Sequence, residues 1–134
     1  MRSIFVNIAT KDIEAAKRFY DAIGFRLNPQ FSDDESACYV IEENIVLMVL
    51  TEPKLSGFLI RPIGDAAEAT QMTLSISCTG RDEVDAMIRT ALDAGGGPWK
   101  PAQDYGFMYA GSFQDPDGHV WEPAWMDPAR LQPT

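Results

Sequence analysis

The same order of strand and helix patterns occurs twice along this chain of 134 residues. Residues 4–9 alternate as in a half-buried strand, and 12–23 have apolar positions at helical spacing. The alternation returns in 70–78 and the helical spacing in 80–94. Three further strands are predicted after each helix, at 25–31, 36–42 and 45–51, and at 99–103, 107–114 and 119–125. The repeat therefore predicts an α+β fold of two tandem βαβββ modules.

The two modules span residues 1–52 and 70–126, and each is too small to bury its sheet alone, so we expect one domain over 1–134. The segment 53–69 between them shows no periodicity. A segment of that length is usually functional or mobile, and its apolar residues 58–60 indicate packing as a flap or lid. A plain linker is the alternative.

The sequence Asp115-Pro116-Asp117-Gly118 predicts a hairpin turn between the last two strands.

Charge and hydropathy narrow the possible partners. Eleven Lys and Arg residues against twenty Asp and Glu residues give a net charge of -9, which repels nucleic acid and anionic lipid. Apolar stretches fall far short of the roughly 20 residues of a membrane span, and the first residues read as a strand and not as a signal peptide. We expect a cytoplasmic protein with two buried, reduced thiols, Cys38 and Cys78.

Two segments add a family resemblance to the repeated pattern. They are KDIEAAKRFY at 11–20, with Gly24-Phe25 after it, and DPDGHVWE at 115–122. Together with the repeat, they resemble the glyoxalase/bleomycin resistance/dioxygenase superfamily, also called the vicinal oxygen chelate superfamily, over nearly the whole chain. The resemblance implies sheets that curve into a half-barrel cup around a small-molecule site, and commonly a homodimer. It does not specify the reaction, because this fold carries many chemistries.

The resemblance also implies where a divalent metal would be held in the metal-dependent members. The first-strand ligand position falls on Phe5, the second-module position on or beside Thr73, and the fourth-strand position near Met48 or Val49. Only Glu122 matches the family pattern. A catalytic metal needs about three protein ligands, so we expect no cofactor and no family-type metal site. A metal held at a non-standard site is the alternative.

Strand alternation predicts which side chains line the cup. The set is Phe5, Asn7, Met48, Thr73, Ser75 and Glu122. Such a mixture of apolar and hydrogen-bonding groups suits a small organic ligand. Tyr109, from an aromatic cluster, is added as a residue that could stack on a bound ring. Glu122 is the candidate proton donor or acceptor, whereas His119, the only histidine, is predicted to point away from its face as a surface residue.

Three functions fit these residues. The first is a metal-free cup that binds a small organic molecule, and the missing ligands favour it. The second is an enzyme, either a glyoxalase-type lyase or isomerase similar to lactoylglutathione lyase, with Glu122 as acid and base, or a dioxygenase-like metalloenzyme with a non-standard metal site. The third is an interaction protein with an empty cup, which predicts that no cavity of ligand size is present.

Overall fold

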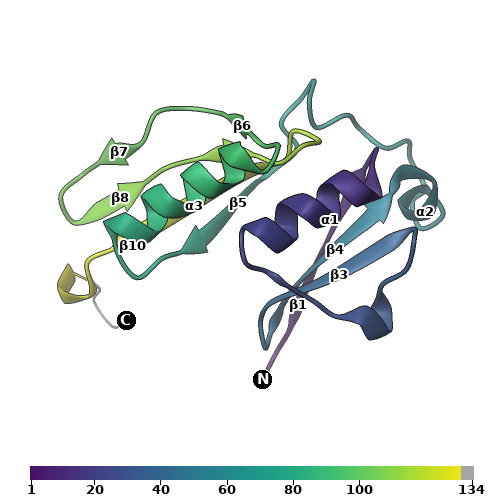
Figure 1. Ribbon diagram of the computed structural model, residues 1–134, viewed down its shortest axis with the longest axis horizontal. Helices are drawn as coiled ribbons and strands as arrows, with labels where there is room; N and C mark the ends of the chain where they lie inside the picture. The colour runs from purple at the N-terminus through teal and green to yellow at the C-terminus, as the bar shows by residue number, and fades with distance from the viewer. Residues whose placement is uncertain (131–134) are drawn as a thin grey trace. The chain divides into compact units, whose positions relative to one another are not determined.

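The computed structural model describes residues 1–130 and divides into two compact units, Met1–Asp65 and Ala66–Thr134. Each unit has a helix packed on a sheet, in the order strand, helix, strands (Figure 1). The prediction of an α+β fold with tandem βαβββ-like modules is thus confirmed. The boundary between the units falls within the segment 53–69. Among residues 1–130 no helix has the length and apolar character that crossing a bilayer requires.

Unit 1 contains a four-stranded sheet, sheet A, with strand order β1-β4-β3-β2. β1 runs parallel to β4, and the other neighbouring pairs are antiparallel. Its elements are β1 (Ile4–Thr10), α1 (Ile13–Ala22), β2 (Arg26–Leu27), the 3-10 turn η1 (Pro29–Phe31), β3 (Ser36–Glu42), β4 (Ile45–Thr51) and α2 (Glu52–Ser56). The predicted strand 25–31 is shortened to β2, because Pro29 begins the 3-10 turn and has no backbone N–H to donate to a sheet.

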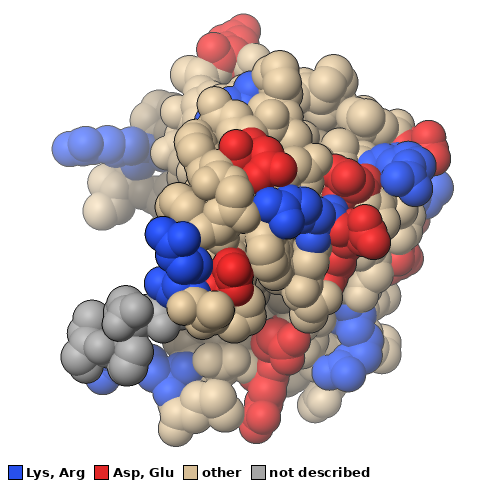
Figure 2. Space-filling model, turned by 90° about the vertical axis from the view of Figure 1, so that its left-hand side faces the viewer, with Lys and Arg blue, Asp and Glu red and all other residues tan. Residues whose placement is uncertain are grey.

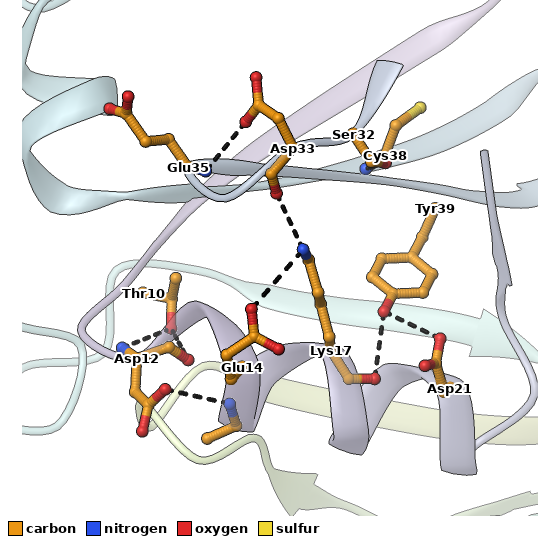
Figure 3. Close-up of polar contacts among 11 residues, drawn as sticks. Thr10, Asp12, Glu14, Lys17, Asp21, Ser32, Asp33, Glu35, Cys38 and Tyr39 are labelled. Atoms are coloured by element: carbon orange, nitrogen blue, oxygen red, sulfur yellow. Dashed lines mark hydrogen bonds and ion pairs between the residues drawn. The ribbon is translucent and has the colours of Figure 1, made fainter. Parts of the chain in front are cut away.

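α1 covers one face of sheet A. The carboxylate of Asp12 accepts a hydrogen bond from the backbone N–H of Ala15 and caps the helix, and Phe19 and Tyr20 are completely buried beneath it. The Tyr39 hydroxyl, from β3, donates toward the Lys17 carbonyl at 3.1 Å and the Asp21 carboxylate at 3.0 Å (Figure 3). Burial, helped by the Asp21 hydrogen bond, raises the Tyr39 pKa. These contacts hold α1 on one face of sheet A and leave the opposite face uncovered by it.

Unit 2 repeats the arrangement with a more broken sheet, sheet B, in which β10 is central. β5 pairs with β10 in parallel, while β8 and β9 pair with its other edge in antiparallel fashion. Its elements are β5 (Thr73–Ser77), α3 (Arg81–Asp93), β6 (Gly97–Pro98), β7 (Gln103–Asp104), β8 (Met108–Ala110), β9 (Phe113–Gln114), β10 (Val120–Met126) and the 3-10 turn η2 (Pro128–Arg130). α3 lies across one face of this sheet (Figure 1).

Two predicted strands of unit 2 differ from the structure. The strand predicted at 107–114 is interrupted between β8 and β9, and the one predicted at 99–103 is replaced by the short β6 and β7. The interruption contains Gly111, where a Cβ atom would collide with the Cδ1 atom of Ile88 on α3. A larger residue at position 111 would therefore have to displace the end of the Ile88 side chain, and a glycine inside a strand pattern often marks such an irregularity.

The turn 115–118 joins β9 to β10 as predicted. The carbonyl of Asp115 accepts from the Gly118 N–H at 3.0 Å, and the Asp115 carboxylate accepts from the N–H groups of Asp117 and His119 at 2.9 Å each. Gly118 has a φ of +93°, a conformation that side chains disfavour. Cys38 and Cys78 are both buried and unpaired, in agreement with the prediction.

Candidate functional site

The face of sheet A that α1 leaves uncovered carries the predicted ligand residues of unit 1. Phe5 pairs with Val46 and Asn7 with Met48 across the parallel β1–β4 ladder. The side chains of these four residues share one face of the sheet. Strand residues two apart point the same way, and residues paired across neighbouring strands point to the same side. Phe5 is 62% exposed. This open face is therefore largely apolar, with one amide in it.

A cavity of about 580 Å³ lies at the end of this open face. That volume falls within the range of roughly 300–1,000 Å³ typical of small-molecule sites. α2 contacts both β1 and β4, so the segment after β4 supplies part of the cavity wall. The lining residues are Asn7, Ser36, Met48, Leu50, Lys54, Leu55, Phe58 and Leu59.

The structure thus brings two of the predicted residues, Asn7 and Met48, into one cavity, while Phe5 lies outside its lining. Phe58 and Leu59 belong to the apolar stretch that was expected to pack as a flap or lid, whereas the sequence did not single out Ser36, Leu50, Lys54 or Leu55. Ser36 arrives because β3 pairs with β4 in a register that places it opposite Leu50. Lys54 arrives through α2, although the segment 53–69 shows no periodicity in the sequence. The apolar residues 58–60 were the available signal for that wall.

The open face of sheet B holds the predicted residues of unit 2. Ser75 lies opposite Glu122 in the β5–β10 register, and Thr73 lies opposite Val120. The Glu122 side chain is 22% exposed, and its carboxylate lies 3.9 Å from the Lys100 ammonium. Thr73 and Ser75 are exposed. This face is polar, in contrast to the open face of sheet A, and the ligand roles of these residues stay predictions.

Tyr109 lies on the other face of sheet B. It pairs with Trp125 on β10, which is three residues from Glu122 and so points to the opposite side. The Tyr109 hydroxyl donates to the Asp85 carboxylate of α3 at 2.6 Å, and this hydrogen bond raises the pKa of Tyr109. The Arg81 guanidinium lies 4.7 Å from the centre of the Trp125 ring. Tyr109 therefore belongs to the contact between helix and sheet, and it does not share a face with Glu122.

The prediction that His119 is a surface residue is wrong. His119 is 8% exposed and buried next to the turn, where its backbone N–H is held by the Asp115 carboxylate. The turn also approaches the backbone of Ala67, which lies close to Gly118. The position of His119 next to a turn did not make it exposed, because the segment before β5 passes beside that turn.

The residues at the positions where metal-dependent members of the family hold a divalent ion do not suit such an ion. Within residues 1–130 no three His, Cys, Asp or Glu side chains cluster in a way that could hold an ion. Phe5 and Met48 offer no hard ligand atom. The Ser75 hydroxyl lies opposite Glu122 and the Lys100 ammonium lies near its carboxylate, while Val120 and Ala124 on the same face are apolar. A cation beside the single carboxylate competes directly with a metal for it.

A second, shallower hollow of about 360 Å³ lies in unit 2 between α3 and the chain that follows β6. Leu92, Trp99 and Lys100 are among its lining residues. Acidic and basic side chains are interspersed over the face of the molecule in Figure 2, and no continuous basic patch covers that face. Neither feature adds a candidate reaction centre.

Comparison with known proteins gives the family. Residues 3–122 match the model of the Glyoxalase/Bleomycin resistance protein/Dioxygenase superfamily, so the chain belongs to this superfamily. No curated protein matches the chain at a significant level.

Solved structures support the same fold. A glyoxalase-related enzyme from Fulvimarina pelagi is 26% identical, with a TM-score of 0.76 over 93% of this chain and 86% of that one. A hypothetical protein from S. aureus is 22% identical, with a TM-score of 0.78 over 93% and 94% of the two chains. The fosfomycin resistance protein FosX from Listeria monocytogenes is 16% identical, with a TM-score of 0.69 over 98% of each chain.

Proposed function

We propose that this protein binds a small organic molecule in the cavity over the open face of sheet A, and that binding requires no divalent metal. The cavity itself carries the proposal, because it combines apolar walls with a few polar groups in a volume of about 580 Å³. The mismatch between the donor set and the family's metal supports the metal-free part. A superfamily protein with an empty cup would lack such a cavity.

A neutral fluorescent probe tests the proposal. N-phenylnaphthylamine (NPN) becomes emissive when it enters an apolar site, and we expect saturable binding of one NPN per chain in the presence of EDTA. The far-ultraviolet circular dichroism spectrum should stay unchanged, which separates binding to a cavity from binding to a partly unfolded state. Emission that rises linearly with NPN, without saturation, would rule the proposal out.

A second candidate is proton transfer next to a carbonyl, as in a glyoxalase-type lyase or isomerase. Glu122 favours it, since its carboxylate is mostly sheltered from solvent on the open face of sheet B, where a side chain that is unprotonated at neutral pH can accept a proton. If the protein converts methylglyoxal and glutathione to lactoylglutathione, Glu122→Gln should lower the rate by about 10²–10⁴-fold.

The rate of thioester formation, followed by absorbance, provides the measurement for this candidate. Glu43→Gln is the matched control, because Glu43 is an exposed carboxylate of the β3–β4 turn, and it should keep the full rate. Wild-type protein without turnover, or Glu122→Gln with unchanged turnover, would remove the enzymatic candidate.

We also propose a homodimer. Unit 1 exposes large apolar side chains well beyond what scattered surface positions require: Ile4, Phe5, Phe31, Phe58 and Ile60 are 57–103% exposed. A second copy of the chain would cover part of this surface. Sedimentation equilibrium should give twice the chain mass of 14.9 kDa, whereas a constant single-chain mass at all concentrations would contradict the dimer.

A further inference from the structure

The polar groups of the sheet A cavity share one property, which is the ability to donate a hydrogen bond. They are the Lys54 ammonium, the Asn7 amide and the Ser36 hydroxyl, and no carboxylate belongs to the lining. The remaining lining side chains are apolar. The cavity is therefore an apolar volume with one positive charge and two neutral donors.

None of these three side chains is engaged by the protein. Among residues 1–130 the Lys54 ammonium lies in no ion pair, although Lys11, Lys17, Arg81 and Lys100 each have an acidic partner. Within the same residues the Asn7 amide and the Ser36 hydroxyl make no side-chain hydrogen bond. Ser36 is only 7% exposed, so little of its surface is available to bulk water. Asn7 and Lys54 are exposed, so solvent satisfies their donors in the free protein, and a ligand in the cavity would take the place of that solvent.

The backbone around Lys54 is ordered by local contacts. Thr51 caps α2 by accepting a hydrogen bond from the Lys54 N–H at 3.4 Å, and Pro53 occupies the first turn of this helix. These contacts place residue 54 at the cavity wall and leave its side chain free to reach the ligand. Residue 54 thus brings a positive charge to this wall in a chain whose net charge is -9.

We propose that the ligand is an organic anion with an apolar body, and that Lys54 selects the anion. The inference rests on the proposed function and adds the chemical class of its ligand. The anionic group accepts hydrogen bonds from Lys54, with Asn7 and Ser36 as further donors, while the apolar body lies against Met48 and Leu50. Charge-assisted bonds are stronger than neutral ones, so a cationic or neutral ligand of equal size binds less tightly.

Two probes of nearly the same shape test the proposal. Anilinonaphthalene sulfonate (ANS) carries a negative charge, and NPN is its neutral counterpart. Lys54→Met keeps most of the side-chain length and removes the charge, and we expect it to weaken ANS binding about tenfold while NPN binding is unchanged. Lys54→Arg should restore ANS binding, since it keeps the charge. Fluorescence titrations give the dissociation constants of both probes for the wild type and Lys54→Met, and that of ANS for Lys54→Arg.

Arg18→Met controls for a general effect of net charge, because it removes an exposed cation from α1, on the face of sheet A opposite the cavity, and ANS binding should not change with it. If ANS and NPN both bind the wild type and Lys54→Met alters neither, the anion inference is wrong and the proposed function stands. If neither probe binds saturably to the wild type, both fail. Equal weakening of ANS binding by Arg18→Met and Lys54→Met would also contradict a specific role of Lys54.

Discussion

Met48→Trp should weaken NPN binding by about 100-fold or more, which corresponds to about 2.8 kcal/mol. Met48 lies on the open face of sheet A, half-buried and opposite Asn7, and its side chain forms part of the cavity wall. An indole at this position occupies volume that the ligand needs. Because the side chain points away from α1, the substitution leaves the packing of Phe19 and Tyr20 against the other face untouched.

Leu92→Trp is the matched control for this prediction. Leu92 is 41% exposed and lines the shallower hollow of unit 2, so an added indole there should leave NPN binding unchanged. Titration of both variants, with circular dichroism as a check of folding, gives the comparison. Normal NPN affinity in Met48→Trp would place the ligand elsewhere, and loss of affinity in Leu92→Trp would place it in the hollow of unit 2.

Gly118→Ala should lower the free energy of unfolding by about 3 kcal/mol, as the sum of two costs. The φ of +93° is unfavourable for any residue with a side chain. A Cβ atom at this position would also lie 2.8 Å from the Ala67 Cα atom and 2.9 Å from the Ala67 nitrogen. Both are backbone atoms, so relief requires a shift of the turn or of the segment before β5.

Gly106→Ala separates the two costs. Gly106 also has a positive φ, +83°, but an added Cβ atom there would meet nothing within 4 Å. Gly106→Ala should therefore lower the free energy of unfolding by the conformational cost alone, which is about 1–2 kcal/mol. Urea unfolding of both variants gives the difference. Equal losses would show that the turn 115–118 is not held against Ala67 in solution.

Much of the fold follows from periodicity alone. Strands 36–42 and 45–51 have the predicted bounds, and both long helices begin and end within one residue of prediction. These segments have regular apolar spacing, so local pattern and tertiary packing agree. The interruption between β8 and β9 contains Gly111, which lies against Ile88 of α3, a contact that the local sequence does not reveal. α2 is a five-residue helix with no apolar period to detect.

The site was less predictable, because it depends on which strands become neighbours. Alternation placed Asn7 and Met48 on one face, but Ser36 joins them only through the β3–β4 register. Tyr109 was expected at the ligand site, but its pairing with Trp125 places it on the face of sheet B that α3 covers. The sequence of its own segment does not contain this information. Which strands pair, and in which register, is decided when the whole unit folds, so it cannot be predicted from the pattern of one segment.

Metal dependence of ligand binding tests the central claim most directly. NPN is titrated into EDTA-treated protein and then into the same protein with zinc, nickel, manganese or iron, and each sample is dialysed and analysed for retained metal. The account predicts one unchanged dissociation constant throughout and no stoichiometric retention of any ion. NPN binding that occurs only with one of these metals, together with retention of one ion per chain, would contradict it.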